Sequence, residues 1–197
     1  LILRAKCRGC GEPISALYPA VELVTALIWT YMAWRFGASL AALSGAVFVT
    51  ILFGIAMTDA REYIIPDEFS LGGLVIGLLF SVAGGLQTLG VALLGAAVGF
   101  GVLWLVGMLG TWAFKKDAMG GGDIKMMAMV GAFLGWQGVL LTIFLGALLG
   151  TLIFVPITLV KKDKLVPFGI FLALGAVATL LVGPQILEWY RGYLAAA

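Results

Sequence analysis

The sequence contains no histidine, and only 11% of its 197 residues are charged. Without histidine these residues cannot form a Ser-His-Asp triad, a Cys-His pair or a His-ligated metal site. Apolar residues make up 62% of the chain, whereas a soluble domain usually carries about a quarter charged residues. This composition excludes a surface that faces water on every side, and a lipid bilayer is the solvent that tolerates it.

The twelve lysines and arginines lie in clusters between apolar runs. They form no basic stripe with interleaved aromatic residues, so nothing supports a nucleic-acid partner. The apolar runs instead predict an all-α, polytopic transmembrane helical bundle. We expect about seven spans, near residues 18–36, 40–58, 69–84, 89–113, 126–138, 139–160 and 166–186.

The stretch from Met126 to Val160 is too long for one span and short for two. Its only small and polar interruption is the sequence Gly-Trp-Gln-Gly at residues 135–138. Two spans here would place ten lysines and arginines on the cytoplasmic side, including the lysines of residues 161–164, and leave only Arg35 and Arg191 outside. Because cytoplasmic loops are enriched in Lys and Arg, the seven-span interpretation is preferred.

The chain begins at Leu1 without a methionine or a signal-peptide pattern, so we expect a further segment upstream. We divide the chain into a cytoplasmic loop, residues 1–17, and a transmembrane bundle, residues 18–197. Glycines recur inside the spans, and small residues at four-residue spacing let membrane helices approach closely. Packing is therefore the expected role of most of the glycines.

Two aspartates stand out because carboxylates are costly to bury near a bilayer. Asp59 ends the apolar run from Val47 to Thr58, and Asp123 follows three glycines, residues 120–122, just before a new span. The predicted topology places both at the cytoplasmic ends of different helices. Either aspartate alone is interpreted more simply as the cap of a helix end, which is how we interpret Asp67.

Two carboxylates at one depth can share a proton, since like charges a few ångströms apart cannot both ionise in a low dielectric. The ionised acid can then activate water while the protonated acid polarises a peptide carbonyl. This chemistry needs neither histidine nor metal. Gly120 and Gly122, which lack side chains, would let a substrate backbone approach Asp123.

Several motifs, taken in chain order, resemble those of the type IV prepilin peptidases, a family of GxGD-type intramembrane aspartic peptidases. The first lies near the N-terminus and runs from Cys7 through Cys10 to Glu22. The second is Asp59 with a downstream Ile-Pro-Asp. The third is the GxGD region around Asp123. The matching segments are residues 7–15, 18–22, 59–67, 120–136 and 167–175.

The resemblance implies that Asp59 and Asp123 are the catalytic pair of an eight-span bundle in the bacterial inner membrane, with its active site at the cytoplasmic face. It implies removal of the leader peptide from type IV pilin or secretion pseudopilin precursors. In bifunctional members the new N-terminus is then methylated with S-adenosylmethionine as the methyl donor. The implied partners are the prepilin transmembrane helix and its leader.

Four further residues have open interpretations. Cys7 and Cys10 form one CxxC, which is half of a four-cysteine zinc site or simply two free thiols. Glu22 is either a charge near a helix N-terminus or part of the methyl-donor site. Lys125 pairs with Asp123, holds substrate, or only marks the cytoplasmic side, and the last is the simplest interpretation.

Two other functions are compatible with a polytopic bundle. Paired intramembrane acids also serve proton relays in ion-coupled transporters. However, both aspartates lie toward one membrane face, and no inverted repeat is visible. A structural protein of the pilus assembly platform would have no need of paired aspartates.

Overall fold

A computed structural model describes residues 8–116, 119–160 and 168–196 of the chain. Cys7 and residues 161–167, which include Lys161, Lys162, Lys164 and Pro167, lie outside the described residues. The described part forms six α-helices and no strand, which confirms the all-helical prediction. The helices are α1 (Leu17–Phe36), α2 (Leu40–Glu62), α3 (Asp67–Val82), α4 (Leu89–Phe114), α5 (Gly121–Val160) and α6 (Phe168–Ala196).

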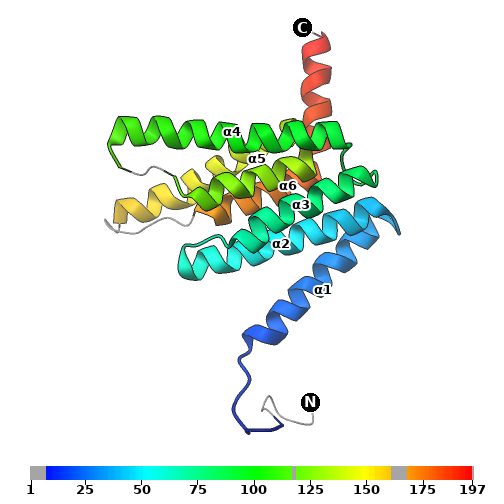
Figure 1. The fold of residues 1–197 in the computed structure, drawn as a ribbon, viewed down its shortest axis with the longest axis vertical. Helices are drawn as coiled ribbons and strands as arrows, with labels where there is room; N and C mark the ends of the chain where they lie inside the picture. The colour runs from blue at the N-terminus through cyan, green and yellow to red at the C-terminus, as the bar shows by residue number, and fades with distance from the viewer. Residues whose placement is uncertain (1–7, 117–118, 161–167, 197) are drawn as a thin grey trace.

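Helices α2 to α6 form one bundle, and α1 leaves it at an angle and contacts mainly α2 (Figure 1). The C-terminal end of α6 projects away from the bundle (Figure 1), and Pro184 lies inside this helix. Four helices are long and apolar enough to cross a membrane: α2, α4, residues 121–153 of α5 and residues 168–193 of α6. These helices support a multi-pass membrane protein, while the count of seven spans stays a prediction.

Helix α5 is interrupted at Gly135, within the break that the sequence predicts. Gly135 has φ 70° and ψ 176°, a conformation that favours glycine because it lacks a Cβ atom. Before this residue, α5 packs on α3, where Met129 lies against Gly73 and Phe133 against Gly77. The contacts advance together along both helices, so the first half of α5 runs parallel to α3.

The second half of α5 packs on α6 in the opposite sense. The Thr142 hydroxyl lies 3.1 Å from the Thr179 hydroxyl, and further along α5 Gly146 lies against Leu172. From the first contact to the second, the residue number rises along α5 and falls along α6, so these two segments are antiparallel. Ile65, directly before α3, contacts Gly169 in the first turn of α6, so α3 and α6 begin at the same end of the bundle. Since the first half of α5 is parallel to α3 and the second half is antiparallel to α6, α5 reverses direction at Gly135 (Figure 1).

Glycines bring the backbones of α4 and α5 into direct contact. A Cβ atom at Gly95 would collide with the carbonyl oxygen of Gly131, and one at Gly99 with the carbonyl oxygen of Met127. Membrane helices gain little from burying apolar surface against one another, so close van der Waals contact must hold them together. The predicted packing role of the span glycines is therefore confirmed at this interface.

The core and the lipid-facing surface follow from the same arrangement. Met126, Met127 and Met129 of α5 are fully buried, while large apolar side chains such as Trp104 and Trp112 of α4 are exposed. An apolar surface of this kind suits contact with lipid chains rather than with water. The first half of α5 is thus the centre of the bundle, and Asp123 lies at its beginning.

A glycine substitution tests the α4–α5 contact. Gly99→Ala should lower the melting temperature in detergent by several degrees, because the added methyl group forces two backbones apart at a cost of about 1–3 kcal/mol. Gly101→Ala is the matched control in the same helix, since a Cβ there meets no atom within 4 Å. Equal melting temperatures for the two variants would contradict the contact.

Candidate active site

Asp59 lies in the last turn of α2 and is 5% exposed. Its Oδ2 accepts a hydrogen bond of 3.1 Å from the backbone N–H of Ile170, and the N–H of Gly169 also donates to this carboxyl group. Both amides belong to the first turn of α6, where backbone N–H groups have no partner within the helix. Asp59 therefore ties the end of α2 to the beginning of α6.

Gly169 makes this approach possible. A Cβ atom at residue 169 would lie 2.8 Å from Asp59 Oδ2 and 2.9 Å from Ile65 Cδ1, both closer than real Cβ contacts allow. The carboxyl group and the isoleucine thus fill the space that any other side chain would need. A substitution at residue 169 would have to move one of them.

Asp123 lies in the first turn of α5 and is partly buried. The backbone N–H of Gly120 donates a hydrogen bond to its carboxyl group. A side chain in the first turn of a helix often accepts such a bond from the residue that precedes the helix. Its other oxygen, Oδ1, is buried and has no hydrogen-bond partner among the described residues. Such an oxygen requires a donor, and a water molecule or a substrate group is the obvious one.

The two predicted aspartates lie at the same end of the bundle. Asp59 is within electrostatic range of Asp123, as the topology predicted for two helix ends at one depth. Ile65, in the loop between α2 and α3, lies between the beginnings of α5 and α6. It contacts Gly122 before Asp123 and Gly169 beside Asp59, and it is 9% exposed.

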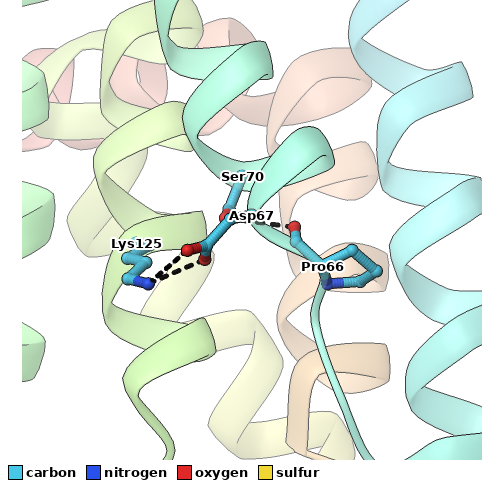
Figure 2. Close-up of polar contacts among 4 residues, drawn as sticks. All are labelled: Pro66, Asp67, Ser70 and Lys125. Atoms are coloured by element: carbon cyan, nitrogen blue, oxygen red, sulfur yellow. Dashed lines mark hydrogen bonds and ion pairs between the residues drawn. The ribbon is translucent and has the colours of Figure 1, made fainter.

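Lys125 forms an ion pair that the sequence did not suggest. Its Nζ lies 2.7 Å from Oδ1 and 2.8 Å from Oδ2 of Asp67, the first residue of α3 (Figure 2). The side chains of Lys125 and Asp67 are 38% and 55% exposed. In this structure Lys125 therefore pairs with Asp67 rather than with Asp123, and Asp67 is more than a helix cap.

The glycines before Asp123 differ in their surroundings. A Cβ at Gly120 would meet only the Asp123 carboxyl, at 3.3 Å, and a Cβ at Gly121 would meet no atom within 4 Å. At Gly122, by contrast, a Cβ would lie 2.8 Å from Cβ of Ile65. The open side of this segment is thus at residues 120 and 121, while Gly122 is packed against the α2–α3 loop.

The N-terminal candidates lie apart from the aspartates. Glu22 is exposed on α1, and neither of the two described cavities includes it. Neither cavity therefore supports a methyl-donor role for Glu22. Cys10 is an exposed free thiol, and the described residues contain no group of three or more Cys, Asp or Glu that would hold a metal ion. Nothing among the described residues supports the zinc site, and Cys7 lies outside them.

A cavity of about 340 Å³ opens elsewhere, around the break of α5 and the proline of α6. Its lining includes Gln87, Gly135, Pro184 and Arg191 but none of the predicted site residues. The Arg191 guanidinium donates a hydrogen bond of 3.0 Å to the Gln137 side chain near its mouth. The end of the bundle that holds the aspartates is therefore the better candidate for chemistry.

Sequence reasoning did not identify three residues that shape the site: Ile65, Gly169 and Ile170. Ile65 and Gly169 belong to segments that carried the family resemblance, and that was the available signal. Their contacts with one another and with Asp59 join residues more than a hundred positions apart. No local pattern in a single sequence reports such a contact.

Comparison with known proteins gives two family matches. Residues 46–155 match the model of the type IV leader peptidase family, and residues 1–36 match that of the bacterial peptidase A24 N-terminal domain. No solved structure matches the chain significantly.

Several curated relatives share the name prepilin leader peptidase/N-methyltransferase. The protein from Aeromonas hydrophila is 38% identical over 197 residues, covering 96% of this chain and 67% of the relative. The proteins from Legionella pneumophila and Pseudomonas putida are 34% and 37% identical, covering 98% and 94% of this chain and 68% and 66% of their own lengths. The chain thus spans about two thirds of these relatives. With the family model covering both candidate aspartates, the chain belongs to the type IV leader peptidase family.

Proposed function

We propose that the protein is an aspartic endopeptidase that removes the leader peptide from type IV pilin or pseudopilin precursors. The observation that carries the proposal is the placement of Asp59 and Asp123, from two different helices, at one end of the bundle and within electrostatic range. Membership of the leader peptidase family and the names of the relatives support the same function.

The chemistry follows from two carboxyl groups that share one proton. The ionised carboxylate accepts a proton from a water molecule, and the resulting nucleophile attacks the peptide carbonyl carbon. The protonated carboxyl donates a hydrogen bond to the carbonyl oxygen as negative charge develops there. Oδ1 of Asp123 is buried and finds no partner among the residues that the structure describes, so it is suited to bind the water or, when protonated, the carbonyl oxygen. Gly120 and Gly121 leave room for the substrate backbone on that side.

We place this site at the cytoplasmic face of the inner membrane and propose seven spans for these residues. The reversal of α5 at Gly135 supports this count, because it divides Met126–Val160 into two oppositely directed segments. With this count, most of the lysines and arginines are cytoplasmic, as membrane topology generally requires. The substrate would reach the aspartates with its transmembrane helix in the bilayer and its leader in the cytoplasm.

We also propose methylation of the new N-terminus, with S-adenosylmethionine as methyl donor, because the relatives carry that second activity in their names. Residues 1–36 match an N-terminal domain of the family, which is distinct from the peptidase region matched by residues 46–155. Glu22 lines neither of the two cavities named above, so we derive no methyl-transfer step. Zinc binding at Cys7 and Cys10 stays a prediction.

Removing either carboxyl group should abolish leader cleavage. Asp59→Asn and Asp123→Asn should each reduce the rate by at least about 100-fold, since an amide neither accepts the proton from water nor supplies the shared proton. The measurement is cleavage of a purified prepilin in detergent. Glu62→Gln, an exposed carboxyl in the same turn of α2 as Asp59, is the matched control and should retain wild-type activity. Cleavage by either asparagine variant at clearly more than about a hundredth of the wild-type rate would refute the pair.

The cleavage rate should depend on pH with an optimum and a decline on both sides. In acid both aspartates are protonated and no carboxylate remains to activate water. In alkali both are ionised and no proton remains for the carbonyl oxygen. The pH–rate profile of the purified enzyme checks this, with the Glu62→Gln profile as control. A rate that rises steadily to the alkaline limit of stability would exclude the shared proton.

Methyl transfer should not need the aspartate pair. Asp123→Asn is expected to lose cleavage but to methylate a pilin supplied without its leader at the wild-type rate, because a free amine needs no peptide-bond chemistry. Incorporation of a labelled methyl group from S-adenosylmethionine measures this. Loss of both reactions in an Asp123→Asn protein with an unchanged melting temperature would indicate one shared site.

A further inference from the structure

The segment Ile65-Pro66-Asp67 connects α2 to α3 directly beside the two candidate aspartates, although none of its side chains takes part in the proposed chemistry. We propose that this segment positions the aspartate pair: Ile65 sets the spacing of the helices, and the ion pair of Asp67 with Lys125 sets the orientation of Asp123. This inference rests on the proposed peptidase function and adds positioning residues to it.

Ile65 supplies the spacing. Its side chain touches Gly169, which lies beside Asp59 at the start of α6, and Gly122, which precedes Asp123 at the start of α5. Both neighbours are glycines, and a Cβ atom at either would lie less than 3 Å from the isoleucine side chain. The α2–α3 loop and the first turns of α5 and α6 are therefore in close contact. Any change in this side chain alters the distance between the two helix ends that carry or hold the aspartates.

Pro66 fixes the backbone position at which α3 and its first residue, Asp67, begin. Its φ of −62° is set by the ring, and its carbonyl oxygen accepts hydrogen bonds from the backbone N–H groups of Phe69 and Ser70, both at 3.2 Å. The buried Ser70 hydroxyl donates to the same oxygen at 3.3 Å (Figure 2). The first turn of α3 is therefore rigid, and Asp67 projects from a defined place.

The ion pair then acts on α5. Residues two apart on a helix point to different sides, so Lys125 faces α3 while Asp123 points elsewhere on the same turn. Holding the ammonium group against both oxygens of Asp67, at 2.7 and 2.8 Å, fixes the rotation of the first turn of α5 about its axis. Further along, the contact of Met129 with Gly73 continues the same interface.

The exposure of this pair separates positioning from stability. An ion pair that is 38% and 55% exposed is screened by water and contributes little to the free energy of unfolding. Misplacing a catalytic group by about an ångström, however, can lower a rate by about 100-fold. Breaking the pair should therefore slow the chemistry while leaving the fold nearly as stable as before.

A double-mutant cycle on prepilin cleavage tests the proposal. Asp67→Asn and Lys125→Gln should each lower kcat about tenfold, with KM within about twofold of wild type. The kcat of the double variant should also fall about tenfold rather than 100-fold, because the first substitution has already broken the ion pair. Melting temperatures should fall by less than about 4 °C. Lys125→Arg, which keeps a charged partner for both carboxylate oxygens, should retain kcat within about twofold.

Two further variants complete the design. Glu68→Gln, the exposed carboxyl next to Asp67, is the matched control and should behave as wild type. Ile65→Val removes Cδ1, the atom that faces Gly169, but keeps the Cβ that faces Gly122. It should lower kcat about threefold without raising KM. This variant tests the spacing without depending on charge.

The alternatives give different results. Losses that multiply to about 100-fold in the double variant would mean that Asp67 and Lys125 act separately, and a raised KM with unchanged kcat would make Lys125 a substrate contact. Wild-type kcat in all variants would leave the pair without a role. Each of these results overturns the positioning proposal while the wild-type enzyme still cleaves, whereas a wild-type protein that cleaves no prepilin refutes the proposed function itself.

Discussion

The cost of removing carboxyl groups from water is the constraint on which this end of the molecule depends. Asp59 meets that cost with backbone N–H groups from the first turn of α6, which have no partner of their own in the helix. Asp123 accepts a hydrogen bond from the N–H of Gly120, and its buried Oδ1 has no partner within the described part of the chain. The difference between the two acids is what one expects of a pair prepared for a water molecule and a substrate.

Close backbone contact lets the helices deliver those acids to one place. Glycines at the α4–α5 interface, and Gly169 in α6, have no side chain that would hold the helices apart. Because lipid provides little hydrophobic force between helices, such contacts carry much of the packing. Small residues therefore bring the backbones of α4 and α5 together in the middle of the bundle and let Asp59 approach the first turn of α6 at its end.

The rival functions are weaker for a physical reason. A transporter needs ionisable groups along a path through the bilayer, whereas both candidate acids lie at helix ends on one side of this bundle. A purely structural protein has no use for a buried carboxyl oxygen without a partner, because it destabilises the fold. The arrangement instead resembles a site whose remaining ligand arrives with the substrate, and family membership agrees with it.

The sequence by itself determined the helical class, the membrane setting, the break of α5 near Gly135 and the choice of Asp59 and Asp123, because each depends on composition, on run length or on a motif of adjacent residues. The proposed count of seven spans was inferred in the same way, from run length and the position of the charges. Only the tertiary structure decided that Lys125 pairs with Asp67, that Gly122 is packed against Ile65, and that Gly169 and Ile170 hold Asp59. These contacts join distant segments whose rotation and spacing are set by helix packing, and packing is a property of the assembled bundle rather than of any local stretch of the chain.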